Sequence, residues 1–182
     1  MGINPAMSQS HHKTLAHSSD GLRVGGDYME VRIGRIVLDA VIRVDEFSEE
    51  EEKLLLFEAV FSNLWDYRIP TYSNEPLLID SDGFQHSAYD LSFSATAAKS
   101  RQLKSGTELP RIANEIEGKA RSLGWVAFPR LKKGVVPHRL IFHFYVFEPG
   151  CTSGSVQHSE TLELVFDFSL FGRLLQNSKK EN

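Results

Sequence analysis

Cysteine is nearly absent from this sequence, and long hydrophobic runs are absent as well. Cys151 is the only cysteine among the 182 residues, so no disulfide can form within the chain. A chain of this length can bury enough apolar surface to fold without disulfides. The sequence therefore neither requires nor suggests the oxidising environment of a secreted protein.

The longest apolar stretch, from Leu140 to Phe147, is interrupted by His143. It is far shorter than the ~20 residues that a membrane-spanning helix needs. The first 26 residues contain few large apolar side chains and lack the apolar segment of a signal peptide. We therefore expect a cytoplasmic protein that does not interact with a membrane.

The composition is that of a folded domain, with 41% hydrophobic and 24% charged residues and with twelve Phe, five Tyr and two Trp. Residues 1–26 are rich in Ser, His and Gly and show no periodicity, so we expect a flexible N-terminal tail. Residues 27–176 are expected to form one domain, and residues 177–182 a C-terminal tail.

A first helix is predicted after Ser48. Ser48 and Glu51 have the spacing of a capping box, and the neighbouring glutamates lie where the helix dipole favours negative charge. The residues that recur at helical spacing and predict its buried face are Leu54, Phe57, Val60, Phe61 and Leu64.

A second helix is predicted from Glu108 to Leu123. Thr107 can cap it, Pro110 lies in its first turn, and Gly124 can end it. Its expected buried face consists of Leu109, Ile112, Ile116, Ala120 and Leu123.

The rest of the chain favours strands. Tyr28 to Val44 alternates, with a change of phase at Gly34 that indicates a bulge or a tight turn. Trp125–Phe128 and Leu140–Phe147 are expected to form a hairpin, with the second strand central in the sheet, and a further strand follows around Leu162 to Phe168. The prediction is an α+β fold: a mostly antiparallel sheet with two main helices on one face.

Charge is distributed unevenly. Residues 98–139 contain ten Lys or Arg and only three Glu, a net charge of +7, whereas the remainder of the chain carries −11. Such asymmetry within one chain indicates an anionic partner. The leading hypothesis is a non-enzymatic module that binds DNA or RNA through a basic helix-hairpin segment, 98–139. The residues expected to contact phosphates are Arg111, Lys119, Arg121, Arg130, Lys132, Lys133 and Arg139.

The main alternative is a structural or assembly protein. In this hypothesis the acidic residues 45–52 of one copy, or of a protein partner, bind the basic residues 130–139 of another. Charge-mediated association of this kind would weaken as ionic strength rises.

Catalytic and metal-binding interpretations have less support. Cys151 could act as a nucleophile with His158 or His86, but its local sequence matches no nucleophile motif. His138 and His143 are five residues apart, so on one strand they would face opposite sides, which argues against a shared metal. We expect no catalytic site, metal or cofactor, and we interpret His143 as a core histidine with a hydrogen-bond partner.

Overall fold

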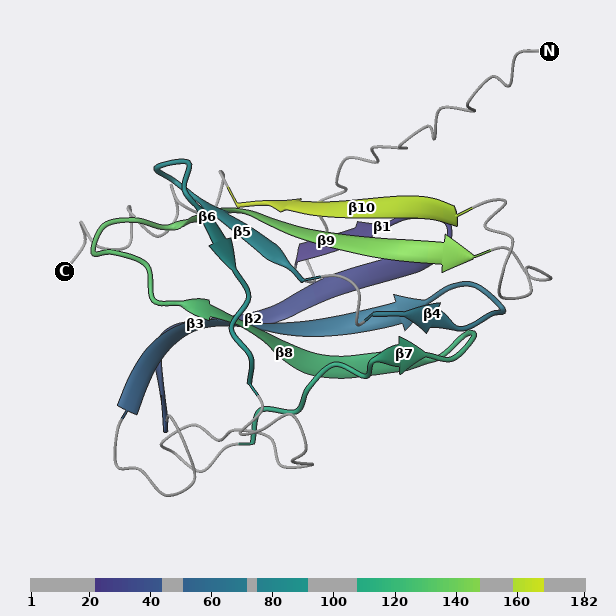
Figure 1. Ribbon diagram of the computed structural model, residues 1–182, viewed down its shortest axis with the longest axis horizontal. Helices are drawn as coiled ribbons and strands as arrows, with labels where there is room; N and C mark the ends of the chain where they lie inside the picture. Colours follow the sequence, from purple (N-terminus) through teal and green to yellow (C-terminus); the bar gives the residue numbers. More distant parts are fainter. Residues whose placement is uncertain (1–21, 44–50, 72–74, 92–107, 148–158, 169–182) are drawn as a thin grey trace, which may run out of the picture.

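A computed structural model describes residues 22–43, 51–71, 75–91, 108–147 and 159–168. Within these ranges the chain forms ten β-strands and no helix. The α+β prediction is therefore wrong, and the described part of the chain is an all-β sandwich (Figure 1).

Two antiparallel sheets of four described strands each make up the sandwich. The first has the order β1-β2-β3-β8, in which the strands are β1 (Leu22–Gly25), β2 (Met29–Arg43), β3 (Glu51–Asn63) and β8 (Arg121–Pro129). The second has the order β10-β9-β5-β6, in which the strands are β10 (Ser159–Asp167), β9 (Pro137–Phe147), β5 (Leu77–Asp80) and β6 (Gln85–Ser87). A small additional sheet pairs β4 (Ile69–Pro70) with β7 (Glu115–Ile116).

The main core lies between the two sheets, because alternate residues of each strand point inward. Phenylalanine dominates it, and several rings contact one another edge to face or stacked. The core phenylalanines are Phe57, Phe61, Phe128, Phe142, Phe144, Phe166 and Phe168.

The predicted first helix is wrong because its apolar residues form β3. Phe57 and Phe61 enter the main core, whereas Leu54 and Leu56 belong to a second buried cluster on the outer face of the same sheet. That cluster also contains Leu91 and Leu109, so segments beyond the sheet cover both faces of β3 in this region. A strand buried on both faces produces a continuous apolar run, which periodicity alone does not separate from a helix.

The predicted second helix is wrong as well. Residues 108–114 carry no helix; β7 follows, and the chain turns at residues 117–120 before β8 begins at Arg121. The expected apolar face is divided: Leu109 packs in the outer cluster, Ile116 lies in the main core, and Leu123 is 52% exposed.

The expected hairpin 125–147 is also absent from the described structure. Both strands exist, but β8 pairs with β3 and β9 pairs with β10 and β5, so the two belong to different sheets. The basic loop between them crosses from one layer of the sandwich to the other (Figure 1).

Several local predictions are confirmed. β2 is one strand with a register shift between Ile33 and Arg35, which places a bulge at Gly34. β9 is central in its sheet, and β10 ends just before the buried Phe168. The sequence Asp80-Ser81-Asp82-Gly83 predicts a turn after Ile79, and the chain does turn there between β5 and β6, with a φ of 86° at Gly83.

The segment expected as an N-terminal tail overlaps β1, which pairs with β2 from Leu22 to Gly25. Residues 1–21 and 169–182 lie outside the described residues. No helix in the described ranges is long and apolar enough to cross a membrane.

Candidate ligand pocket at the open edge

The two long edges of the sandwich differ. At one edge β1 lies against β10, and we call this the closed edge. At the other edge β8 faces the end of the second sheet that carries β5 and β6, and we call this the open edge (Figure 1).

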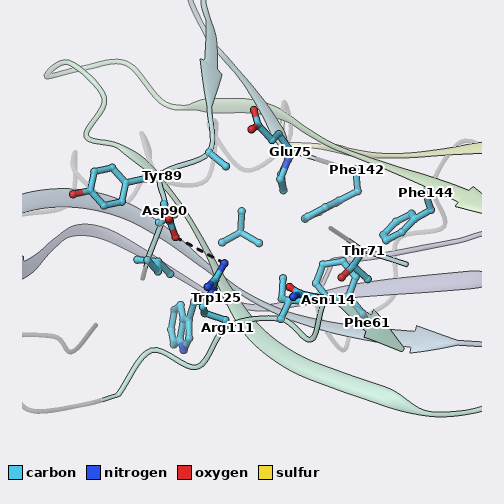
Figure 2. A pocket seen from close by; sticks show the side chains of 16 residues that line it. Phe61, Thr71, Glu75, Tyr89, Asp90, Arg111, Asn114, Trp125, Phe142 and Phe144 are labelled. Carbon is cyan, nitrogen blue, oxygen red and sulfur yellow. Dashed lines mark ion pairs between the residues drawn. The ribbon is translucent and has the colours of Figure 1, made fainter. Parts of the chain in front are cut away.

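A cavity of about 330 Å³ lies at the open edge, a volume at the lower end of the range for small-molecule sites. Phe61, Val126, Phe142 and Phe144 from the main core contribute its apolar wall. The remaining lining residues come from β8 and from three short segments, and they are Thr71, Glu75, Pro76, Ala88, Tyr89, Asp90, Leu91, Arg111, Ile112, Asn114, Trp125 and Ala127. We call this site the edge pocket (Figure 2).

Two of the lining segments are held on the outer edge of β8 by hydrogen bonds. The backbone N–H of Tyr89 donates to the Ala127 carbonyl at 2.7 Å, and the N–H of Trp125 donates to the Pro110 carbonyl at 3.0 Å. Residues 125 and 127 are two positions apart on one strand, so their edge groups point the same way. The residues that follow these contacts, Asp90 and Arg111, are thereby brought to the same side of the pocket.

Gly124 allows this close approach. A Cβ atom at residue 124 would lie 2.5 Å from the backbone nitrogen of Ile112 and 2.8 Å from the carbonyl carbon of Arg111. The segment carrying Arg111 and Ile112 can therefore lie against β8 only because residue 124 has no side chain. The predicted role of Gly124 as a helix terminator is wrong.

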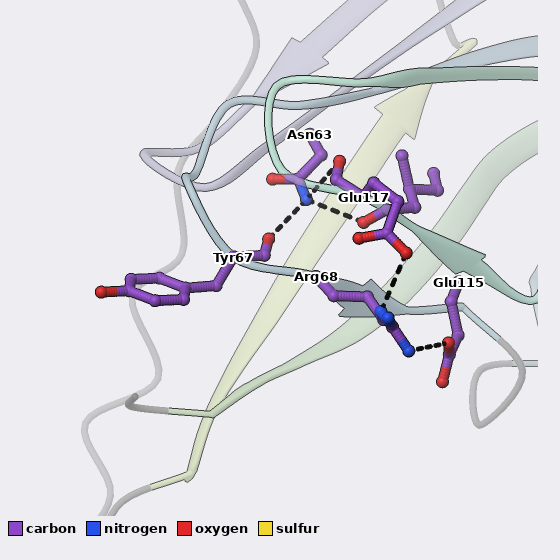
Figure 3. A network of polar contacts seen from close by, with 6 residues as sticks. Asn63, Tyr67, Arg68, Glu115 and Glu117 are labelled. Atoms are coloured by element: carbon purple, nitrogen blue, oxygen red, sulfur yellow. Dashed lines mark hydrogen bonds and ion pairs between the residues drawn. The ribbon is translucent and has the colours of Figure 1, made fainter. Parts of the chain in front are cut away.

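The small β4–β7 sheet adjoins another part of the pocket lining, and Figure 3 shows the polar contacts around this sheet. The buried Asn63 side chain donates from Nδ2 to the carbonyls of Tyr67, Ile116 and Glu117, and it accepts a hydrogen bond from the N–H of Trp65. Arg68 adds ion pairs to Glu115 and Glu117. Beyond these contacts the Thr71 N–H donates to the Asn114 carbonyl at 2.7 Å, which joins two pocket-lining residues.

Opposite charges meet at one margin of the pocket. Arg111 Nη2 lies 3.9 Å from Asp90 Oδ1, and the two side chains are 53% and 69% exposed (Figure 2). A distance of 3.9 Å is too long for a hydrogen bond, and exposed pairs of this kind contribute little to stability. Figure 2 shows Glu75 at a different margin and Phe142 and Phe144 across the cavity from Asp90.

Tyr89 and Trp125 connect the pocket to the outer face of the first sheet. The Tyr89 hydroxyl donates to Glu52 at 2.6 Å, and Arg35 lies over the Trp125 ring with its Cζ 5.1 Å from the ring centre. Arg35 also donates two hydrogen bonds of 2.8 Å to Glu58, which lowers the pKa of the Glu58 carboxyl.

The β5–β6 hairpin ends close to the pocket and is organised by Asp80. Its carboxylate accepts hydrogen bonds from the N–H groups of Asp82 and Phe84, each at 2.9 Å, and lies 2.8 Å from His86 Nε2. Burial by itself raises the pKa of Asp80, but the hydrogen bonds from His86 and from the backbone of Phe84 and Asp82 outweigh burial. The pKa of Asp80 is therefore below its ordinary value.

The basic residues predicted to bind nucleic acid do not form one surface. Lys119 and Arg121 lie at the beginning of β8, whereas Arg130, Lys132 and Lys133 lie beyond its end. A strand of nine residues separates the two groups by about 30 Å. Arg139 lies on β9 in the other sheet, opposite Asp167 in register.

Carboxylates also offset much of this positive charge. Lys119 lies 3.3 Å from Asp66, Arg130 pairs with Asp39, and Arg111 pairs with Asp90. Because the helix and the hairpin that were to present these residues do not exist, the nucleic-acid hypothesis for 98–139 is wrong.

Of the other candidate residues, His143 is not in the core: it lies on the outer face of β9, and its Nε2 is 3.3 Å from Glu163. Within the described ranges no three His, Cys, Asp or Glu side chains are grouped as metal ligands. Cys151, His158 and residues 45–50 lie outside the described residues. A protein partner, self-association and a cytoplasmic location stay predictions.

The sequence interpretation missed most of the edge pocket. Asp90 alternates with the apolar Tyr89 and Leu91, which predicts only the solvent-exposed face of a strand, and Arg111 was assigned to the wrong ligand. Thr71, Glu75 and Asn114 carry no motif, and their spacing along the chain gives no indication that they meet. The pairing of β8 with its two edge segments and the pairing of β4 with β7 bring parts of the lining together, and both pairings join residues far apart in the chain.

No family model and no curated protein matches the chain. Two solved structures are similar. The candidate lipoprotein YcdA from Bacillus subtilis has 12% identity and a TM-score of 0.40, over 83% of this chain. An uncharacterised β-sandwich protein from Clostridium difficile has 14% identity and a TM-score of 0.36, over 84% of this chain and 99% of its own. The match spans only 39% of YcdA.

Proposed function

We propose that this protein is a binding module that holds a small amphipathic organic molecule in the edge pocket. The observation that supports the proposal is the cavity itself: about 330 Å³, with an apolar wall of core residues and polar groups at its margins. Pockets of this size and composition are the usual sites for small ligands.

The wall and the margins would contribute differently to binding. An apolar group of the ligand would contact Phe142, Phe144 and Val126 and lose its contact with water, which is the favourable term. Polar groups at the margin, including Thr71 and Asn114, would orient the ligand. The wall belongs to the rigid core, so little conformational entropy would be lost on binding.

Tryptophan fluorescence provides a direct test. The chain has two tryptophans, and Trp65, which packs on Tyr28 and Tyr67, is not one of the lining residues. In Trp65→Phe, Trp125 in the pocket lining is the only tryptophan. We expect 3-phenyl-1-propanol and similar aromatic alcohols to change its emission saturably and to raise the Tm.

A blocking variant and a matched control complete the test. Ala88 lines the pocket, whereas Ala113 is exposed and outside the lining. Ala88→Trp should fill the cavity and abolish binding, whereas Ala113→Trp should leave binding intact. Both variants retain Trp65, and binding is measured by the change in Tm and by calorimetry. Equal binding by both variants, or no saturable binding by wild type, would refute the proposed function.

A further inference from the structure

We infer that the ligand of the edge pocket is a free α-amino acid with an apolar side chain. In this arrangement its carboxylate pairs with Arg111, its ammonium pairs with Asp90, and its side chain enters the cavity. The inference rests on the proposed function and specifies the class of ligand.

The spacing of the two charges supports this assignment. In an α-amino acid the ammonium and the carboxylate are attached to one carbon atom, so complementary charges on a protein must also be neighbours. Asp90 Oδ1 and Arg111 Nη2 are 3.9 Å apart at one margin of the pocket. A ligand approaching this margin would place opposite charges beside both groups at once.

The geometry of Arg111 leaves room for such a ligand. A guanidinium binds carboxylates best through two parallel hydrogen bonds of about 2.7–2.9 Å. The 3.9 Å contact with Asp90 is an ion pair without that geometry. A ligand carboxylate could take the two-hydrogen-bond arrangement without displacing a strong contact of the protein.

The charge balance of the lining argues against ligands with a single charge. Among the described lining residues there are one guanidinium, Arg111, and two carboxylates, Asp90 and Glu75. An anion at Arg111 would also meet the negative potential of both carboxylates, whereas a cation at Asp90 would meet Arg111. A zwitterion has favourable partners for both of its charges.

The apolar wall then selects the side chain. Phe142 and Phe144 lie across the cavity from Asp90 (Figure 2). An aromatic or branched aliphatic side chain extending from the charged margin would contact these rings. A charged side chain would lose its hydration there without a partner, so apolar amino acids should be preferred.

The test compares L-phenylalanine with three analogues by calorimetry. The analogues are 3-phenylpropanoate, which lacks the ammonium, 2-phenylethylamine, which lacks the carboxylate, and the uncharged 3-phenyl-1-propanol. Each missing charge-assisted contact should weaken binding by about tenfold. L-Phenylalanine is therefore expected to bind most tightly, and L-lysine weakly.

Charge-removing variants show which protein side chain binds which charged group of the ligand. Arg111→Gln should weaken L-phenylalanine and 3-phenylpropanoate but not 2-phenylethylamine, and Asp90→Asn should weaken L-phenylalanine and 2-phenylethylamine but not 3-phenylpropanoate. The ion pair of Arg130 and Asp39 is similarly exposed, at 50% and 52%, and lies outside the pocket lining. Arg130→Gln and Asp39→Asn are therefore matched controls and should change none of these affinities.

The outcomes separate the inference from the proposed function. The inference is overturned if 3-phenyl-1-propanol binds as tightly as L-phenylalanine, or if Arg111→Gln and Asp90→Asn do not each weaken the ligands named for them. In either case, loss of binding in Ala88→Trp would still support the proposed function. If none of the four compounds binds and Ala88→Trp has no effect on any ligand, both are overturned.

Discussion

At the closed edge, β1 and β10 bring aliphatic side chains directly together, whereas at the open edge short backbone segments separate β8 from the second sheet. Leu22, Val24, Leu162 and Leu164 are buried at the first edge. At the second edge the segments around Tyr89 and Arg111 occupy the free side of β8 through backbone hydrogen bonds. The same sandwich is thus completed by apolar packing on one side and by polar contacts on the other.

This difference shows how an all-β fold can keep a cavity. Side chains from adjoining strands fill the interior at the closed edge, as close packing requires. Backbone segments fixed by hydrogen bonds cannot move inward to fill the space beside Phe142 and Phe144. The open edge therefore retains a pocket, and the comparison of the two edges can be tested.

The largest effect is expected from truncating core phenylalanines at the two edges. Phe166 of β10 is fully buried and packs on Phe142 and Phe168, whereas Phe144 borders the edge pocket. Phe166→Ala should lower the free energy of unfolding by about 4 kcal/mol. Phe144→Ala should lower it by only about 3 kcal/mol, because the Phe144 side chain already adjoins a cavity. Urea denaturation measures both values, and a larger loss for Phe144→Ala would contradict the comparison.

A Cβ added at each edge should have a smaller but more informative effect. Gly124→Ala at the open edge places the new atom 2.5 Å from backbone, whereas Gly26→Ala at the closed edge places it 2.8 Å from the flexible end of Leu162. We expect a loss of about 2–3 kcal/mol for Gly124→Ala and about 1 kcal/mol or less for Gly26→Ala.

The two glycine variants should also differ in ligand binding. Gly124→Ala should displace the Arg111 segment and weaken binding in the edge pocket, and Gly26→Ala should not. Thermal unfolding and calorimetry give both readouts. Equal destabilisation by the two substitutions would show that Gly124 does not hold the open edge in place.

The smallest effect is a difference in acid sensitivity. The pKa of Asp80 is below its ordinary value in the folded protein, so its contribution to stability is complete above the ordinary carboxyl pKa and is lost as pH falls below about 4. The β5–β6 hairpin at the open edge should then lose amide protection before β10 does. Hydrogen exchange followed from pH 6 to pH 3 measures this order.

Asp80→Asn provides the control for acid sensitivity. It should lower stability at neutral pH by about 1–2 kcal/mol, since a buried charged acceptor is lost, and it should flatten the dependence on pH. An unchanged slope between pH 6 and pH 3 would assign the acid sensitivity to other carboxyl groups.

Local features of the chain could be predicted where one residue type decides the conformation. Gly34 marks the bulge of β2, and Asp80 and Gly83 mark the turn between β5 and β6. Alternating side chains identify β10, because only one face of this strand enters the core.

The misassigned elements share a different property, because their apolar residues are buried by partners distant in sequence. Leu54, Phe57 and Phe61 suit a helical face equally well, and only the cover on both sides of β3 selects a strand. The conformation of residues 108–116 is likewise set by contacts with the outer edge of β8 and with Gly124. No local sequence pattern indicates these contacts.

The sequence by itself determined that the chain folds, since its apolar content, its alternating strands and its turn residues act locally or through composition. The tertiary structure alone decided that β8 and β9 enter different sheets and that Asp90 and Arg111 meet. Strand pairing joins residues far apart in the chain. A periodic pattern indicates which face of a strand is buried, but it does not indicate which strand pairs with it.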